Sequence, residues 1–555
     1  MSNSVTKCLE GVQIAGPTPG FDVVIVGAGF AGMYMLHRAR LLGLRVCAIE
    51  KATDVGGVWY WNRYPGARCD VESLQYSYSF SEELQQEWHW SERFAAQPEI
   101  LTYASHVADR FDLRRDIRFS TGVTEAHYDE AAALWQLQTD QGESLTTRFC
   151  IMATGCLSNA RTPPLPGLDD FTGKTYHTGE WPHEGVDFSG QRVGVIGTGS
   201  SGLQAIPMLA AQAKELVVFQ RTPNFSLPAR NAPMDEAYEK AWKAQYPQKR
   251  QKAREETLSG VLYDRSSLKA HESSAEDRQN EYERRWAGGG INFMHSFNDL
   301  MQNMSSNETA ADFVRAKIRA TVHKPEVADL LAPKDHPIGS KRICVDSNYY
   351  ATYNRENVTL VDLRAAPIVS ITPTGLQTAD QHYQLDSLVF ATGYDAMTGA
   401  LLKMNITGRH GKSLADCWQE GPRTYLGLAI AGFPNMFTIT GPGSPSVLSN
   451  MIFAIEQHVD WIVDCLSHLR VQNITSIEAD AQAQEAWVEH VNHVADQTLF
   501  PLANSWYMGA NVPGKPRVFM PYAGGVGPYR QKCDDVAAKG YEGFHLQALP
   551  AHAPL

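Results

Sequence analysis

The sequence has no excess of basic charge and no paired cysteine motif, and each absence excludes a class of function. Its 49 Lys and Arg against 61 Asp and Glu give a formal net charge of −12. A nucleic-acid-binding protein needs clustered cations to displace phosphate counterions, so no nucleic-acid partner is expected. The nine cysteines are scattered without CxxC spacing. This spacing indicates neither a metal site nor a dithiol redox pair.

Long hydrophobic runs are also missing. The first 20 residues lack the basic stretch and apolar run of a secretory signal. The most apolar long window, residues 425–440, is interrupted by Gly427, Gly432 and Pro434, and it is shorter than the roughly 20 residues that span a bilayer. We therefore expect a cytoplasmic protein without a membrane segment, in which this window forms a buried strand and loop.

What the sequence does contain is enough chain for several cores. At about 150 residues per domain, 555 residues predict three to four units. Apolar residues make up 43 % and charged residues 20 %, as in ordinary globular domains. A multidomain globular protein is therefore predicted.

The first strong motif follows an apolar run of strand length, FDVVIV. Gly27, Gly29 and Gly32 form G-x-G-x-x-G ahead of a helical pattern. The first glycine permits a tight turn, the second lets the backbone approach a pyrophosphate, and the third allows the helix to pack closely on the strand. Glu50 ends the next strand, at a distance suited to bonding a ribose hydroxyl. This arrangement predicts an FAD site.

A second copy of the motif differs at the position that selects the ligand. Gly197, Gly199 and Gly202 repeat the turn, but the following strand ends in Arg221 and Thr222 with no acid. A carboxylate there would repel a 2′-phosphate, whereas a guanidinium can bind it through paired charged hydrogen bonds. The second site is therefore predicted to bind NADPH.

The remaining chain divides around these two motifs. Residues 228–336 are rich in charged helix formers and predict a helical insertion. Ala-Thr-Gly segments at Ala153 and Ala391 follow apolar strands and are interpreted as crossings between two nucleotide domains. The prediction is an α/β fold of two Rossmann-like domains. Residues 1–157 and 394–555 bind FAD, residues 158–227 and 337–393 bind NADPH, and residues 228–336 are inserted in the NADPH domain.

Several stretches resemble one enzyme family, the Baeyer-Villiger monooxygenases. FTGKTYHTGEWP resembles their F-x-G-x-x-x-H-x-x-x-W-P fingerprint, and GGVWYWNRYPGARCD, residues 56–70, is similar to their second signature. SWYMGANVPGKPR, residues 505–517, resembles their mobile loop over NADP, which we place at about residues 492–516. GPGSPSVLSN, residues 441–450, is most similar to the phenylacetone and steroid monooxygenase group. The fingerprint residues are Phe171, Gly173, His177, Trp181 and Pro182.

The resemblance implies a reaction and roles for particular residues. These enzymes use FAD, NADPH and O2 to convert a ketone to an ester or lactone through a C4a-peroxyflavin anion. Arg342 resembles the active-site arginine whose charge favours that anion, and Asp70 resembles the acid that positions it. His177 is expected to couple domain positions to cofactor binding and not to transfer protons.

Cofactor contacts are implied in the same way. Lys341 and Arg221 would bind the 2′-phosphate, Arg68 would contact the cofactor from the flavin side, and Trp506 would close over NADP. The full predicted set is Gly27, Gly29, Phe30, Gly32, Glu50, Gly57, Val58, Trp59, Arg68, Asp70, Tyr76, Val123, Thr198, Gly199, Ser200, Ser201, Gly202, Gln204, Arg221, Thr222, Lys341, Arg342, Met451 and Trp506.

Two alternative functions stay open. An N- or S-oxygenating flavin monooxygenase also carries two glycine motifs, but it would not need Arg342. A non-catalytic FAD- and NADP-binding redox sensor would bind both nucleotides without turnover, with residues 228–336 as a partner surface. The ketone, whether aryl, steroid or cyclic, and the selectivity of its oxidation are not predicted. The oligomeric state is open, with a monomer compatible, and Cys156 has no assigned role.

Overall fold

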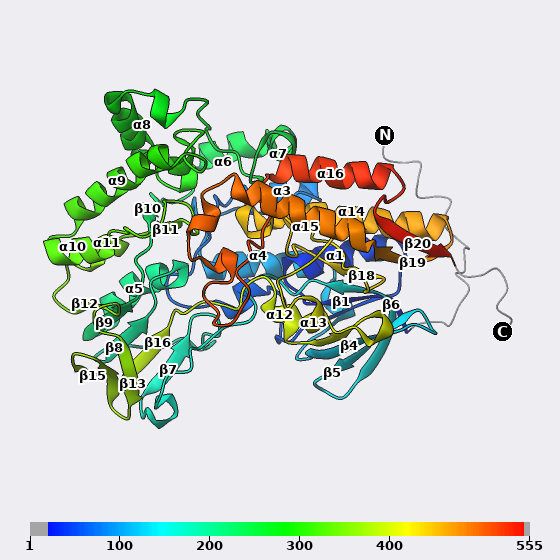
Figure 1. Cartoon of the computed structure of the whole chain (residues 1–555), viewed down its shortest axis with the longest axis horizontal. Helices are drawn as coiled ribbons and strands as arrows, with labels where there is room; N and C mark the ends of the chain where they lie inside the picture. Colours follow the sequence, from blue (N-terminus) through cyan, green and yellow to red (C-terminus); the bar gives the residue numbers. More distant parts are fainter. Residues whose placement is uncertain (1–19, 549–555) are drawn as a thin grey trace.

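Two sheets, each carrying one of the glycine motifs, lie side by side in the computed structural model, which describes residues 20–548 (Figure 1). We call the sheet that contains β1 and its helices the first lobe, and the sheet that contains β8 and its helices the second lobe. Residues 1–19, where no export signal was expected, and residues 549–555 lie outside the described residues.

The sheet of the first lobe has the strand order β17-β4-β5-β6-β1-β2-β3, and β18 also pairs with β6. The strands around β1 are parallel, whereas β4, β5 and β6 form an antiparallel meander. β17 and β18 come from the C-terminal part of the chain, where β17 extends the sheet beyond β4 and β18 pairs with β6. The strands are β1 (Phe21–Val26), β2 (Val46–Ile49), β3 (Ile117–Arg118), β4 (Val123–Asp129), β5 (Leu134–Thr139), β6 (Ser144–Met152), β17 (Asn405–Thr407) and β18 (Met436–Thr438).

The sheet of the second lobe is entirely parallel, with the order β12-β9-β8-β16-β7. Its central strands are almost wholly buried, because helices cover one face and a small antiparallel sheet, β13-β14-β15, covers the other. The strands are β7 (Lys174–His177), β8 (Arg192–Ile196), β9 (Glu215–Gln220), β12 (Val358–Asp362), β16 (Ser387–Phe390), β13 (Ile368–Thr372), β14 (Gly375–Thr378) and β15 (His382–Gln384).

Helices of the first lobe come from both ends of the chain. The long helix α14 packs along α1, and Asp460 on α14 accepts a 2.7 Å hydrogen bond from the Tyr34 hydroxyl on α1. A lone early βαβ unit could not cover its own sheet, and the C-terminal helices supply the cover. The helices are α1 (Phe30–Leu41), α2 (Val58–Trp61), α3 (Glu82–Glu87), α4 (Gln97–Arg110), α12 (Gly399–Leu402), α13 (Leu414–Cys417), α14 (Met451–Val471), α15 (Ala481–Asp496) and α16 (Val526–Ala538).

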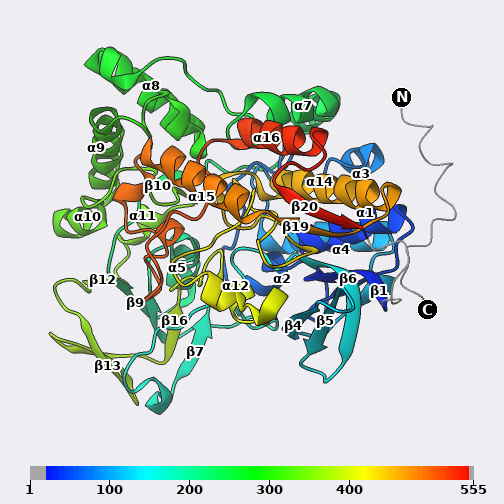
Figure 2. The same ribbon diagram turned by 45° about the vertical axis from the view of Figure 1, so that its right-hand side comes forward.

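The helical insertion, which the sequence predicts within the NADPH domain, contacts both lobes. α7 lies beside α16 of the first lobe (Figure 2). The Lys243 ammonium on α6 donates to the Gln86 and Trp88 carbonyls, and Arg250 on α7 donates to the Ser77 hydroxyl. The helices are α6 (Glu236–Lys243), α7 (Tyr246–Glu256), α8 (Ala275–Gly288), α9 (Met304–Thr321) and α10 (Pro325–Leu331).

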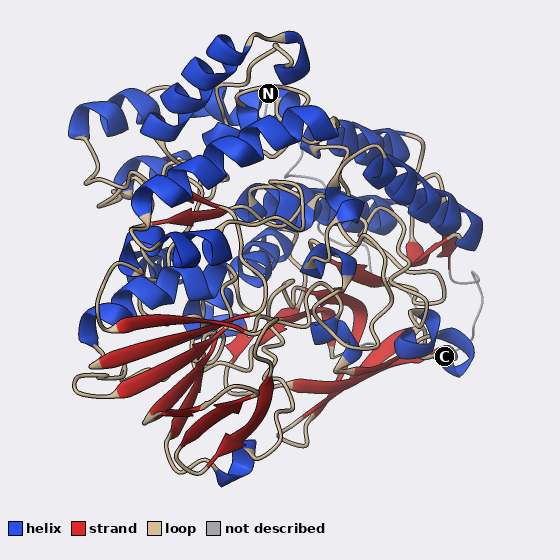
Figure 3. Cartoon of the chain, turned by 60° about the vertical axis from the view of Figure 1, so that its left-hand side comes forward, coloured by secondary structure: helices blue, strands red, loops and turns tan. Residues whose placement is uncertain are grey.

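Helices gather on one side of the molecule and the two large sheets on the other (Figure 3). The predicted loop at about residues 492–516 starts later than expected, because residues 492–496 form the last turn of α15.

Of the helices between residues 20 and 548, none has the length and apolar character that a bilayer crossing requires. The predicted α/β fold with two dinucleotide-binding units is confirmed. The remaining elements are α5 (Ser200–Gln212), α11 (Tyr349–Thr352), β10 (Ser226–Pro228), β11 (Cys344–Asp346), β19 (Ile474–Ala479) and β20 (Phe544–Ala548).

Candidate active site

The two glycine motifs make the same contact with the two Ala-Thr-Gly segments. Gly27 follows β1 with φ +107°, and a β-carbon there would lie 2.6 Å from the Ala153 carbonyl oxygen. Gly197 follows β8 with φ +110°, and a β-carbon there would lie 2.4 Å from the Ala391 carbonyl oxygen. Each crossing segment therefore packs directly on a glycine turn, and both turns require glycine for conformation and for space.

The turns leave helix N-termini free for phosphate. α1 begins after Gly29 and α5 begins after Gly199, and neither helix has a side-chain N-cap. A β-carbon at Gly199 would meet no atom within 4 Å, whereas Gly57 approaches Gly29 closely from the neighbouring segment. Uncapped N–H groups and glycine-only backbone are what a pyrophosphate needs, so both sites fit a dinucleotide.

Glu50 is buried beside the first turn and is held by backbone amides. Its Oε2 accepts from the Ala28 N–H at 2.6 Å, and its Oε1 accepts from the Ala52 N–H at 2.8 Å. Burial raises the pKa of this carboxyl group despite those bonds. Each oxygen keeps a second lone pair that can accept a further hydrogen bond. The bond to a ribose hydroxyl is therefore possible, and it stays a prediction.

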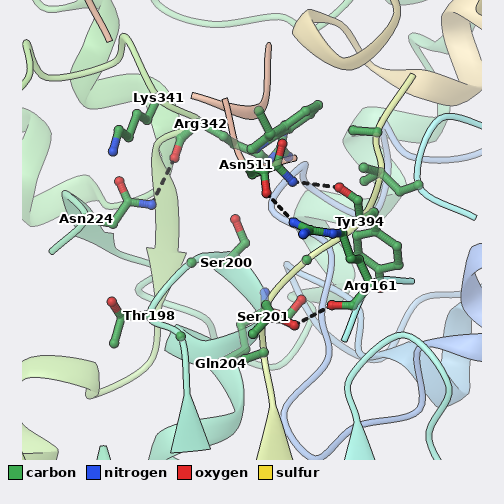
Figure 4. A pocket seen from close by; sticks show the side chains of 18 of the residues that line it. Arg161, Thr198, Ser200, Ser201, Gln204, Asn224, Lys341, Arg342, Tyr394 and Asn511 are labelled. Carbon is green, nitrogen blue, oxygen red and sulfur yellow. Dashed lines mark hydrogen bonds between the residues drawn. The ribbon is translucent and has the colours of Figure 1, made fainter. Parts of the chain in front are cut away.

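A cavity of about 720 Å³ lies between the lobes and collects most of the predicted residues (Figure 4). Lys341 and Arg342 lie on one side of it, Arg161 and Tyr394 on the other, and the second glycine turn closes a third side. The predicted residues that line it are Val58, Trp59, Arg68, Asp70, Tyr76, Thr198, Gly199, Ser200, Ser201, Gln204, Arg221, Thr222, Lys341, Arg342, Met451 and Trp506.

One end of the cavity carries converging positive charge. Burial lowers the pKa of Lys341, and the charges of Arg221 and Arg364 lower it further against the opposing effect of Asp335. Arg364 forms an ion pair with Asp335. Cations brought this close favour an anion between them, as the 2′-phosphate of NADPH would supply.

Arg342 and Asp70 form a forked ion pair on the cavity wall. Nη2 of Arg342 donates to both carboxylate oxygens, at 2.7 and 2.6 Å, and Nη1 lies 3.3 Å from the Val447 carbonyl oxygen. Asp70 is the main cause of the raised pKa of Arg342. The arginine still exposes 31 % of its side chain, so a fixed positive charge faces the cavity.

The segment that ends in Asp70 also contacts the second glycine helix. The Tyr64 hydroxyl donates to Gln204 Oε1 at 2.7 Å, and Gln204 Nε2 donates to the Arg68 carbonyl at 3.0 Å. Gly66 has φ +86°, and a β-carbon there would lie 2.4 Å from the Gln204 carbonyl. Residues 56–70 thus connect the two nucleotide sites, and Trp59 Nε1 donates to the Tyr76 hydroxyl at 3.1 Å within the cavity wall.

The fingerprint residues do not line the cavity. His177 ends β7, accepts from the Gly179 N–H at 2.9 Å through Nδ1, and lies 3.3 Å from the Thr392 hydroxyl through Nε2. Burial lowers its pKa, which favours the neutral imidazole. This contact with the second crossing segment suits a structural link between the lobes. Phe171, Gly173, Trp181 and Pro182 lie in the same linker, outside the cavity lining.

Other predicted residues lie elsewhere. Gly27, Gly29, Phe30, Gly32, Glu50 and Gly57 surround the first turn, and Gly202 packs under the second. Val123 starts β4, outside the cavity lining, and its cofactor contact stays a prediction. The Arg68 side chain forms an ion pair with Glu92.

Two basic residues were missed from the sequence: Arg161, which lines the cavity, and Arg364, which lies outside its lining but acts on the pKa of Lys341. Arg364 follows β12, and only the pairing of β12 with β9 brings it beside Arg221. Arg161 follows the first crossing, and its Nη1 donates to the Asn511 carbonyl at 2.6 Å. The sequence does show a basic residue just after a strand or a crossing in each case. It does not show the strand order that brings these residues to the site.

Cys156, left without a role by the sequence, lies beneath residues 440–447. Its buried thiol is 3.2 Å from the Thr440 carbonyl oxygen and 3.0 Å from the Ser446 hydroxyl. Thr440 and Ser446 have φ of 56° and 40°, a region that costs free energy for residues with side chains. The thiol therefore contacts both strained residues ahead of Val447, whose carbonyl faces Arg342.

Comparison with known proteins gives this geometry a context. Residues 21–246 match the family model "Pyridine nucleotide-disulphide oxidoreductase". A Baeyer-Villiger monooxygenase of Pseudooceanicola batsensis is 43 % identical, covering 94 % of this chain and 95 % of that protein. A phenazine N-monooxygenase of Lysobacter antibioticus is 42 % identical, covering 96 % and 98 %.

The fold matches solved structures over nearly its whole length. A steroid monooxygenase bound to NADP superposes with a TM-score of 0.91 at 55 % identity, covering 95 % of this chain and 99 % of that one. The two nucleotide motifs, the Arg342–Asp70 pair and this similarity agree with the resemblance noted from the sequence. The chain belongs to the Baeyer-Villiger monooxygenase family.

Proposed function

We propose that this enzyme binds FAD and NADPH and uses O2 to convert ketones to esters or lactones. Solved relatives hold both cofactors. We assign residues 1–157 and 394–555 to FAD, residues 158–227 and 337–393 to NADPH, and residues 228–336 to the insertion. The observation that carries the proposal is the Arg342–Asp70 pair on a cavity between two dinucleotide motifs.

The glycine turns would hold the pyrophosphates at the N-termini of α1 and α5. Arg221 and Lys341 would bind the 2′-phosphate. Bound FAD, reduced by NADPH, would supply the activation of O2, of which one atom enters the ketone and the other leaves as water. The overall change is ketone, O2, NADPH and a proton to ester, NADP⁺ and water.

Arg342 stabilises negative charge in this reaction. Oxygen insertion next to a carbonyl passes through an adduct whose carbonyl oxygen becomes an oxyanion, and a fixed guanidinium beside it lowers the barrier. Asp70 holds the guanidinium in place by accepting two hydrogen bonds from one nitrogen. Because Asp70 also supplies a counter-charge, it limits the cost of keeping Arg342 in a partly dry cavity.

The walls exclude water from the reacting atoms. Trp59, Tyr76, Val447 and Met451 give the Arg342 side of the cavity an apolar surface, which strengthens charge interactions inside it. We keep the cytoplasm as the expected compartment, because the eight described cysteines are free thiols, as in a reducing environment.

The proposal is tested with the purified protein and a panel of aryl, steroid and cyclic ketones. We expect a yellow protein that consumes one NADPH for each ester or lactone formed, measured by absorbance loss against product chromatography. Oxygen transfer to an amine or sulfide but to no ketone in the panel would instead support the N- or S-oxygenating alternative. Binding of both nucleotides with no product of either kind would support the redox sensor.

Cofactor selectivity gives a second prediction. The Arg221→Ala variant should raise KM for NADPH about 10- to 100-fold, because one charge-assisted contact to the phosphate is lost. KM for NADH, which lacks that phosphate, should stay within about twofold of the parent value. Steady-state kinetics with both nucleotides measure the ratio. An equal rise for both nucleotides would contradict the assignment of Arg221.

A further inference from the structure

We propose that Lys515 is a positioning residue for NADPH, because its ion pair with Asp395 fastens the loop of residues 503–517 to the second crossing segment, residues 391–396. This inference rests on the proposed function, since it concerns how that cofactor is enclosed. It adds a role for two residues that neither glycine motif nor fingerprint contains.

The ion pair is short and largely shielded. Lys515 Nζ donates to Asp395 Oδ1 at 2.6 Å and to the Ala396 carbonyl at 2.7 Å. The lysine side chain is 10 % exposed and the aspartate side chain is 25 % exposed. For comparison, the side chains of the pair between Lys539 and Glu542 are 62 % and 57 % exposed. Shielded pairs are screened less by water and salt than exposed ones.

Two further bonds hold the same loop, one directly to the second crossing segment and one to Arg161. Asn511 Nδ2 donates to the Tyr394 carbonyl at 2.7 Å, and the Asn511 carbonyl accepts from Arg161 Nη1 at 2.6 Å (Figure 4). Arg161 is itself held on the crossing, because its carbonyl accepts from the Thr392 hydroxyl at 2.6 Å. The loop is thus bound at two points to backbone that follows β16.

Both segments face the cavity. The crossing contributes Thr392, Gly393, Tyr394 and Ala396 to its lining, and the loop contributes Asn504, Ser505, Trp506 and Asn511. The bond between Lys515 and Asp395 therefore connects two walls of one cavity, and it fixes the distance between Trp506 and the second glycine turn.

The charges make this connection specific. Removing either partner leaves the other charge shielded and unpaired, which costs more than the pair contributes. The loop can relieve that cost by lifting away from the crossing, since residues 503–517 contain only the short 3-10 helix of residues 506–508. Lifting would move Trp506 away from the cavity, and NADPH would be held more weakly.

A double-mutant cycle tests the pair. Lys515→Met and Asp395→Asn should each raise KM for NADPH about 10- to 100-fold. The double variant should be no worse than either single variant, because one interaction is lost in all three. Lys515→Arg should restore part of the loss. Lys539→Met, which removes an exposed ion pair, should leave KM unchanged. Multiplied effects in the double variant, or an equal effect of Lys539→Met, would overturn the proposal.

Limited trypsin digestion gives a readout that does not depend on catalysis. Cleavage after Arg517 should be slowed by NADP⁺ in the parent holoenzyme and should persist with NADP⁺ in Lys515→Met. Position 515 precedes a proline, so that bond is a poor trypsin site in both proteins. Equal protection in both proteins would overturn the role of Lys515. Parent protection without any ester product would instead count against the proposed reaction and leave the role of Lys515 intact. Flavin absorbance and melting temperature confirm that each variant is folded.

Discussion

Replacing Arg342 with alanine is expected to lower the rate of ester formation about 10²- to 10³-fold, the usual effect of removing one oxyanion-stabilising group. Its charge faces the cavity and is fixed by Asp70. The glycine turns and the phosphate-binding cations are untouched, so NADPH should still be consumed, with hydrogen peroxide released in place of ester. Product chromatography and a peroxide assay measure the two outcomes.

Two variants bracket this result. Arg284→Ala removes an arginine that is 56 % exposed and pairs with Glu281, and it should leave the ester rate unchanged. Asp70→Asn should retain the guanidinium but lose its fixed orientation, and so lie between the parent and Arg342→Ala. An Arg342→Ala enzyme that made ester at the parent rate would show that the charge at this position does not act on the reacting oxygen.

Changing Gly32 to alanine should yield a protein without bound flavin. A β-carbon at this position would lie 1.8 Å from the Gly27 carbonyl oxygen and 2.8 Å from its carbonyl carbon, distances that force α1 away from β1. The N-terminus of α1 would then leave the pyrophosphate site. We expect a colourless or poorly expressed protein, assessed by the ratio of flavin absorbance to protein absorbance.

Gly288→Ala is the matched control. A β-carbon at Gly288, in the last turn of α8, would meet no atom within 4 Å, and alanine is the better helix former. Its flavin content should equal that of the parent. Full flavin content in Gly32→Ala would mean that the close contact between α1 and the first turn is not what holds the cofactor.

The residues that could be predicted are those whose role follows from local backbone. Gly27 and Gly197 had to be glycine because a turn after a buried strand needs positive φ, and the sequence shows both the strand and the turn. The pairing of Arg342 with Asp70 came from the family resemblance instead, because 272 positions separate them. No period or spacing in the sequence connects residues that far apart.

The residues that were missed depend on strand order and on contacts between lobes. Arg364 lies beside Arg221 only because β12 pairs with β9. Strand order is set by tertiary packing and cannot be read from the sequence. The sequence shows that the insertion interrupts the chain of the second lobe. It does not show that Lys243 and Arg250 form hydrogen bonds with the first lobe. The charged residues of these helices predict exposure to solvent. An interface made of charged side chains and backbone carbonyls lacks the apolar residues by which a buried surface is usually recognised.

That interface also bears on how the protein denatures. α6 and α7 are connected by the chain to the second lobe, yet they are bonded to residues 75–88 of the first, which include the cavity residue Tyr76. Unfolding of either lobe removes either the hydrogen bonds or the chain connections that hold α6 and α7 in place. We therefore expect the two lobes to unfold on heating in a single cooperative transition, in which the flavin is released and the NADPH site is lost together.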